Sequence, residues 1–108
     1  MGRFGFEEMQ KIQKELQEKY KQQWGGLPPE MGKEKLLWAY AEMGEVADII
    51  KKNSSEDILK SREVREHFIE EMCDVMMYLN DVLLCYDVSP EEIERIYTEK
   101  HRRNMERW

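Results

Sequence analysis

The stretch EEMCDVMMYLNDVLLCYD, residues 70–87, decides the fold, because it puts acids into a helix that is otherwise apolar on nearly every side. At about 100° per residue, Glu71, Asp74 and Asp81 fall on one stripe of that helix. Leucine, methionine, valine and cysteine cover most of the remaining circumference. Such a helix must be enclosed, and a chain of this length can enclose it only in part. We therefore expect a homodimer or homotetramer.

Glycine and proline interrupt the chain at few points, and the segments between them are rich in good helix formers. We predict an all-α protomer of four helices that assembles into an oligomeric helical bundle. The first helix spans about residues 6–23 and ends at WGGLPPEMG, whose prolines lack the N–H that a helix needs. The second spans about residues 33–52 and ends at the polar loop KNSSED, and the third spans about residues 61–86. An apolar stripe recurs at helical spacing on the first helix: Met9, Ile12, Leu16 and Tyr20.

The fourth predicted helix begins at SPEE. Ser89 can accept a hydrogen bond from an N–H group at the helix start, and Pro90 suits the first helical position. Glu92 can complete a capping box with Ser89. No repeat or strand-like alternation competes with this pattern, so residues 1–108 are expected to form a single all-α domain.

Composition and charge argue against several classes of function. The 108 residues are 41% hydrophobic and 37% charged, and the formal net charge of −6 disfavours a nucleic-acid partner held through its phosphates. No uncharged apolar run is long enough to span a membrane, and MGRFGFEEMQ at the N-terminus is unlike a secretory signal. We expect a cytoplasmic protein without a membrane partner. Cys73 and Cys85 lie too far apart on one helix for a disulfide, so both are expected to be reduced.

Two pairs of acids lie on the second and third predicted helices. Glu42 and Glu45 form one pair, and Glu71 and Asp74 form the other. A spacing of three residues projects both carboxylates of a pair from one helix face, so the two pairs can converge. Their mutual repulsion then requires protons or cations among them, and a divalent cation is the simpler solution. Oxygen ligands favour Mg²⁺, with Mn²⁺ as a substitute, over zinc.

The acids have two other interpretations. Either pair taken alone is more simply explained as a solvated helix face, since glutamate is common on helix surfaces. A di-iron carboxylate bundle would use acids in a helical core, but it needs Glu-x-x-His motifs. Neither His67 nor His101 follows a glutamate by three residues. His67, one turn before Glu71, is the histidine close enough to the predicted cluster to touch a substrate, and a surface histidine with no special role is the alternative interpretation.

Taken in order, these motifs resemble a known family. Glu42-x-x-Glu45, 25 intervening residues and Glu71-x-x-Asp74 resemble the MazG-type nucleoside triphosphate pyrophosphohydrolases, relatives of the all-α dimeric dUTPases. AEMGEVADII is similar to the family's Glu-x-Gly-Glu segment, EEMCDVMMYL to its Glu-(Leu/Met)-x-Asp-Val segment, and SPEEIERIYTEKHRRNMERW to its final helix. The similarity covers about residues 16–107. The chain departs from the family at Ala41, where a first glutamate is usual, and it lacks the longer GEEA signature of phosphoribosyl-ATP pyrophosphatases.

The resemblance implies an enzyme that hydrolyses a nucleoside or deoxynucleoside triphosphate to the monophosphate and pyrophosphate, with a role in cleansing nucleotide pools. It implies that Mg²⁺ is held by Glu42, Glu45, Glu71 and Asp74. Bound there, the ion would neutralise charge in the transition state and lower the pKa of the water that attacks the α-phosphorus. Glu45 is our candidate for the general base.

Candidate substrate contacts lie near the acids and on the fourth helix. Trp38 precedes Glu42 by one turn and Tyr78 follows Asp74 by one turn, so both can contact the nucleoside, although ordinary packing is the alternative for each. Asp81 is a candidate for pairing with a basic group or a ribose hydroxyl.

Polar residues of the fourth helix continue the face that carries Ile93 and Ile96. The resemblance favours Lys100 and Asn104 as contacts to the nucleotide. Arg107 shares their face, but a basic residue near a helix C-terminus also favours the helix dipole and often stays solvated. The competing interpretation of the whole chain is a non-catalytic helical oligomerisation module, which predicts neither stabilisation by Mg²⁺ nor turnover.

Overall fold

The computed structural model describes residues 3–107, and within this range all regular secondary structure is helical. The elements in chain order are α1 (Phe6–Lys19), α2 (Lys21–Trp24), the 3₁₀ turn η1 (Pro29–Met31), α3 (Gly32–Lys52), α4 (Ser55–Lys60), α5 (Arg62–Cys85) and α6 (Pro90–Arg107). The all-α prediction is confirmed for the described residues. None of these helices is both long and apolar enough to cross a membrane.

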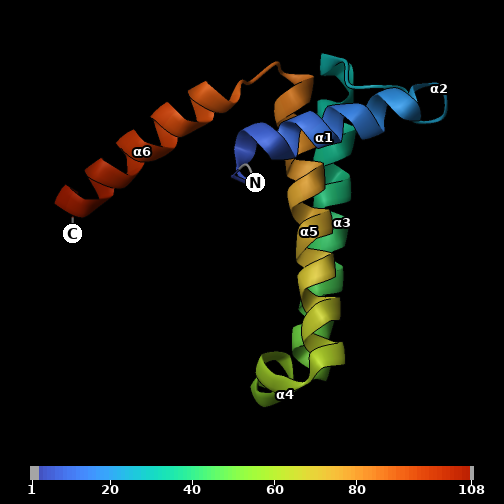
Figure 1. Ribbon diagram of the computed structural model, residues 1–108, viewed down its shortest axis with the longest axis vertical. Coiled ribbons are helices and arrows are strands. Elements are labelled where there is room, and N and C mark those ends of the chain that lie inside the picture. Colours follow the sequence, from blue (N-terminus) through green and yellow to red (C-terminus); the bar gives the residue numbers. More distant parts are fainter. Residues whose placement is uncertain (1–2, 108) are drawn as a thin grey trace.

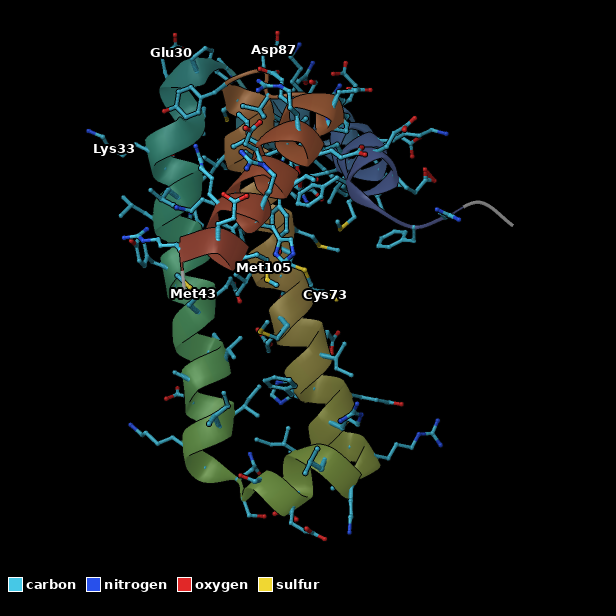
Figure 2. The ribbon with its side chains drawn as sticks, turned by 90° about the vertical axis from the view of Figure 1, so that its left-hand side faces the viewer. Glu30, Lys33, Met43, Cys73, Asp87 and Met105 are labelled. Carbon is cyan, nitrogen blue, oxygen red and sulfur yellow. The ribbon has the colours of Figure 1, made fainter. Side chains whose placement is uncertain are left out.

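The scaffold is a hairpin of the two longest helices, α3 and α5, which run antiparallel and are joined at the far end by α4 (Figure 1). Glu30, before α3, and Asp87, after α5, accordingly lie at the same end (Figure 2). The interface between α3 and α5 is the most extensive in the chain. It holds most of a small buried apolar core, which consists of Ala39, Val46, Ile49, Val75 and Cys85. The hairpin sets the face of α3 that carries Glu42 opposite α5.

The other long helices leave the protomer open. α1 crosses the hairpin near the end opposite α4, and α6 extends away from it (Figure 1). The radius of gyration is 16.3 Å, whereas a compact domain of this length has about 13 Å. Large apolar side chains on the long helices are correspondingly exposed, among them Trp38, Met72, Met76, Met77 and Leu79. A single protomer therefore encloses α5 only in part.

Six α-helices form among residues 3–107, so the predicted number of four was wrong. The predicted first helix breaks at Tyr20, whose backbone leaves the helical region, and α2 follows as one separate turn. The segment KNSSED, predicted as a loop, contributes the start of α4. Ser54 caps α4 by accepting a hydrogen bond from the Asp57 N–H at 3.1 Å. A serine followed three residues later by an acid is a capping signal, so this short helix was readable from the sequence.

Both ends of the connection between α5 and α6 are fixed by local hydrogen bonds. The predicted capping box is confirmed, because the Ser89 N–H donates to Glu92 Oε1 at 3.0 Å and the Glu92 N–H donates to Ser89 Oγ at 3.2 Å. Two residues after the end of α5, Asp87 adopts the left-handed region at φ 56°. The Val88 N–H then donates to the Leu83 carbonyl oxygen at 2.9 Å, which is the pattern of a Schellman motif. These bonds define where α6 starts.

Candidate metal centre

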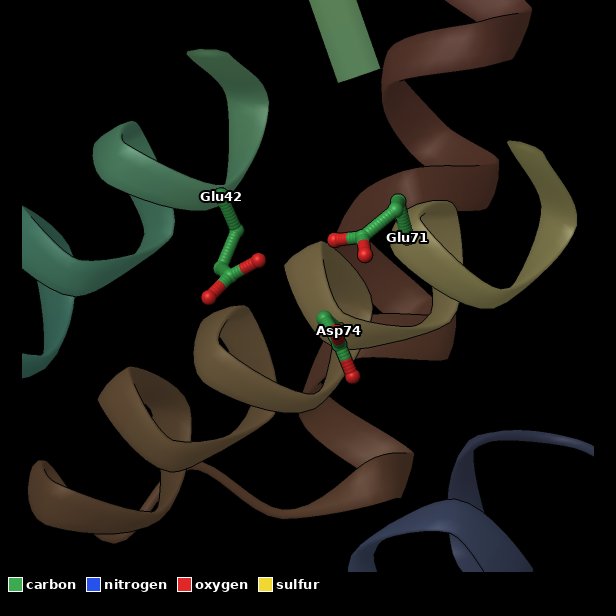
Figure 3. Close-up of side chains that lie close together, drawn as sticks. All are labelled: Glu42, Glu71 and Asp74. Carbon is green, nitrogen blue, oxygen red and sulfur yellow. The ribbon is translucent and has the colours of Figure 1, made fainter. Parts of the chain in front are cut away.

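Three acids from two helices meet on the hairpin. Glu42 of α3 faces Glu71 and Asp74 of α5 (Figure 3), and one carboxylate oxygen from each lies within 4.8 Å of the others. All three side chains are half-buried. On α5 the spacing of three residues puts Glu71 and Asp74 on one face, and the antiparallel packing brings Glu42 to the same level. We call these residues the acidic trio.

The charged forms of Glu42 and Asp74 are disfavoured by partial burial and by neighbouring negative charges. Burial is the main cause that raises the pKa of Glu42 above its ordinary value, followed by a hydrogen bond with Glu71 and by the negative charges of neighbouring acids. Burial also raises the pKa of Asp74, and the negative charge of Glu71 adds to the rise. Converging carboxylates that are partly removed from water favour a proton or a cation between them.

The donor set of the trio suits a small hard cation. An octahedral Mg²⁺ with oxygen ligands at about 2.1 Å separates pairs of ligand oxygens by about 2.9–4.2 Å. The trio oxygens lie within 4.8 Å of one another, so small side-chain rotations bring all three to one ion. No cysteine or histidine belongs to the group found among the described residues. The trio can therefore hold a cation that prefers carboxylate oxygen.

Glu45, the fourth predicted ligand, stands apart from the trio. It lies on α3 one turn after Glu42, its side chain is exposed, and it is not among the oxygens that converge within 4.8 Å. Its negative charge still contributes to the raised pKa of Glu42. The structure thus brings three of the four predicted acids together and leaves Glu45 at the edge of the cluster.

A histidine borders the trio. His67 Nε2 of α5 lies 3.5 Å from Glu71 Oε1, one turn away on the same helix, and its side chain is exposed. The imidazole therefore lies beside Glu71, the member of the trio on the same helix. This position matches the sequence interpretation that placed His67 beside the cluster.

An aromatic pair lies one turn from the trio. The rings of Trp38 and Tyr78 stack across the hairpin with centroids 6.3 Å apart and an interplanar angle of 18°. Trp38 is half-exposed, so the pair presents a flat apolar surface beside the acids. Burial, the charge of Glu42 and the charges of Asp81 and Asp74 raise the pKa of the Tyr78 hydroxyl, which keeps it protonated and able to donate a hydrogen bond.

Asp81 lies in a different environment from the trio. It is 1% exposed, and both of its oxygens accept hydrogen bonds from α1, Oδ1 from Gln13 at 2.9 Å and Oδ2 from Gln17 at 3.1 Å. Lys35 of α3 is also buried and interacts with Asp81 electrostatically. The sequence analysis expected a basic partner for Asp81 without identifying Lys35, and it missed both glutamines. The glutamine spacing on α1 was the available signal, since positions 10, 13 and 17 share one helix face.

The candidate residues of α6 share one face but lie apart from the trio. Lys100 and Asn104 line an open groove of 550 Å³ together with Ile93 and Ile96, and Arg107, which was predicted to share their face, is not among the lining residues. α6 extends away from the hairpin (Figure 1). Among residues 3–107 no recorded hydrogen bond or ion pair joins Lys100 or Asn104 to α3 or α5. Arg107 is the last residue of α6, and its side chain is exposed.

Comparison of the chain with protein-family models, with curated protein sequences and with solved structures finds no match. The resemblance to the MazG-type enzymes therefore stays a prediction that rests on three motifs.

Proposed function

We propose that the protein is a Mg²⁺-dependent nucleoside triphosphate pyrophosphohydrolase that acts as a homodimer or homotetramer. The observation that carries this proposal is the acidic trio, in which three half-buried carboxylates converge from two helices beside an aromatic pair, and the pKa values of Glu42 and Asp74 are raised. A site for a cation next to a flat apolar surface suits a ligand that has phosphates at one end and a base at the other.

In this mechanism Glu42, Glu71 and Asp74 would hold Mg²⁺. The ion would supply neutralisation of phosphate charge and a lowered pKa for the water that attacks the α-phosphorus. Glu45 removes the proton from that water, a role that suits an exposed carboxylate at the edge of the trio better than a ligand role. Trp38 and Tyr78 contact the nucleoside. Asp81 is assigned no substrate contact here, because α1 already occupies both of its oxygens.

The open shape of the protomer supports an oligomer in which a second copy completes the site. α6 projects away from its own hairpin, and its final two turns carry a basic excess, with Lys100, Arg102, Arg103 and Arg107 against Glu106. Those basic residues complement the acids of a hairpin and the phosphates of a substrate. We propose that Lys100 and Asn104 of one copy contact the triphosphate held on the hairpin of another. Exposed apolar residues of α5, such as Met72 and Met76, supply the remaining interface.

The reaction is tested by incubating the protein with each nucleoside and deoxynucleoside triphosphate in the presence of Mg²⁺ and measuring the monophosphate and pyrophosphate. Wild type and Glu70→Gln, a neighbouring exposed acid outside the trio, are expected to turn over at least one substrate. Glu71→Gln is expected to lose that turnover. Hydrolysis in ¹⁸O-labelled water should place the label in the monophosphate. Background rates for every substrate would favour the non-catalytic module, and release of orthophosphate alone would reject attack at the α-phosphorus.

The shared site is tested by mixing two inactive variants, Glu71→Gln and Lys100→Ala, after reversible dissociation. If α6 of one copy serves the hairpin of another, hybrid oligomers contain sites with both residues intact and regain activity that neither parent has. If Lys100 serves its own hairpin, every hybrid site lacks one residue and no activity returns. Each variant mixed with itself is the control.

A further inference from the structure

α1 packs against the hairpin through its polar face. Its buried residues are Gln10, Gln13 and Gln17, which share one side of the helix. Ile12 and Leu16, in contrast, are 40% and 37% exposed. An amphipathic helix is normally held by its apolar stripe, and here Ile12 and Leu16 of that stripe are only partly covered. Residues at the start of α1 line an apolar groove with α5, so hydrophobic burial supports that end and the glutamine bonds add to it further along the helix.

The hydrogen bonds that α1 makes to the hairpin converge on Asp81. Gln13 and Gln17 each donate one bond from Nε2 to a different oxygen of this carboxylate. A third glutamine bond, from Gln10 Nε2 to the Val88 carbonyl oxygen, is longer at 3.3 Å and reaches the loop after α5. Because the two donors lie one turn apart on α1, a single carboxylate fixes both the position and the rotation of that helix.

The closed arrangement keeps polar groups out of water. Burial raises the pKa of Asp81, while the two glutamine bonds and the charge of Lys35 oppose that rise. Besides Lys35 from α3, the titratable groups that interact with Asp81 are Tyr78 and Cys85 of its own helix. α1 contributes two neutral amides, and within the described residues the buried Oε1 of Gln17 has no hydrogen-bond partner. Opening α1 would rehydrate these groups, which lowers the free-energy cost of opening.

The chain connection permits α1 to move separately. Two glycines after α1 and α2, Gly25 and Gly26, adopt φ of 86° and 74°, a region that glycine enters without steric cost. α3 and α5, in contrast, are held to each other by the apolar core. A rearrangement at the glycines can thus swing α1 while the hairpin stays packed.

We propose that α1 is a lid that opens and closes on the α3–α5 hairpin, latched by the hydrogen bonds from Gln13 and Gln17 to Asp81. Opening exposes Asp81, which lies two turns along α5 from Asp74, and so lengthens the accessible part of the hairpin beyond the aromatic pair. The lid is a property of the free protein and does not depend on the proposed enzymatic activity.

Hydrogen exchange on the full chain tests the latch. A detached helix of this length is marginal in water, so its amides exchange whenever the lid opens. The double variant Gln13→Ala/Gln17→Ala removes both donors, and we expect exchange across α1 to accelerate on the order of 10- to 100-fold, with α3 and α5 unchanged. The matched control is Lys14→Ala/Glu18→Ala, which has the same spacing on the exposed face of α1 and should leave exchange as in wild type.

The proposal is overturned if the glutamine variant leaves exchange of α1 unchanged, or if α1, α3 and α5 accelerate together, since α1 would then open only with global unfolding. Asp81→Asn gives a second measurement, because asparagine keeps the shape of aspartate and has one carbonyl oxygen left to accept a glutamine bond. We expect it to accelerate exchange of α1 less than the double variant does. An acceleration equal in α1 and the hairpin would again contradict a separate lid.

Discussion

Trp38 of α3 and Tyr78 of α5 stack across the hairpin, with ring centroids 6.3 Å apart, one helical turn from the acids of the trio. The pair ties together two positions that are 40 residues apart in the chain and leaves Trp38 half-exposed. This stacked ring pair beside the acidic trio is partly open to solvent, and it is the surface where we propose that a nucleobase binds.

Trp38→Ala should therefore weaken substrate binding more than it slows chemistry. Stacking of a base on an aromatic side chain contributes about 1–3 kcal/mol, which corresponds to a rise of about 5- to 150-fold in KM. kcat should change much less, because the role proposed for Trp38 is to contact the base and not to hold the ion or the phosphates. Steady-state kinetics on the best substrate measures both constants. Trp38→Phe keeps an aromatic face and is the control, and an unchanged KM in a folded Trp38→Ala protein would remove Trp38 from the site.

Mg²⁺ should stabilise the fold, and more so as the pH rises. Glu42 and Asp74 have raised pKa values in the folded chain, so between their ordinary and raised values the folded state binds more protons than the unfolded state. Their contribution to stability is present at low pH and is lost as the pH rises through the folded pKa values. Without divalent ions, the Tm of wild type should fall relative to that of Glu71→Gln over this window, because the variant lacks one repelling charge.

Added Mg²⁺ should raise the Tm of wild type relative to that of Glu71→Gln. An ion that binds only the folded state at ten times its Kd contributes about 1.4 kcal/mol, which raises the Tm of a domain of this size by several degrees. The shift should grow with pH, since protons compete for the same oxygens, and should be absent in Glu71→Gln. Glu70→Gln should keep most of the Tm shift that Mg²⁺ causes in wild type. Equal Mg²⁺ shifts in wild type and Glu71→Gln would place the cation elsewhere.

The parts of the structure that were predictable are those that local chemistry decides. Ser89 and Glu92 bond to each other within one turn, so the start of α6 follows from four letters of sequence. The separation of Glu71 and Asp74 by three residues likewise fixes their common face on α5. Convergence with Glu42 required only that the two acidic faces meet, which an antiparallel hairpin with a short connection provides.

The features that the sequence did not predict depend on how the helices pack against one another. The stripe of Ile12 and Leu16 predicts an apolar helix face but does not say what covers it, and in this protomer the glutamine face packs instead. Glu45 follows Glu42 by three residues, just as Asp74 follows Glu71. Glu45 nevertheless lies one turn further along α3 and outside the trio. The direction of α6 depends on the backbone at Asp87. This aspartate adopts a left-handed conformation that could not be predicted from the sequence.

Self-association should depend on the apolar surface of α5. Met76 is 43% exposed and lines an apolar groove of 340 Å³ together with Phe6, Met9 and Leu83. Met76→Glu puts a charge into this surface, and burying that charge in an interface is costly. We expect the variant to shift to the protomer mass in light scattering coupled to size exclusion. Leu59→Glu, on exposed α4 at the far end of the hairpin, should keep the wild-type mass. An oligomer that survives Met76→Glu would move the interface away from this groove.

Asp87→Gly should stabilise the protein. Asp87 sits at φ 56°, where a residue with a Cβ is strained and glycine is the preferred end of a helix. Relief of that strain is worth up to about 1 kcal/mol, partly offset by the greater freedom of glycine in the unfolded chain. Asp87→Ala should destabilise, because alanine keeps the Cβ and loses the polar side chain that tolerates this region. Urea unfolding should order the midpoints as glycine, aspartate and then alanine, with equal m-values, and a glycine midpoint below that of wild type would mean that the Asp87 side chain itself holds the turn.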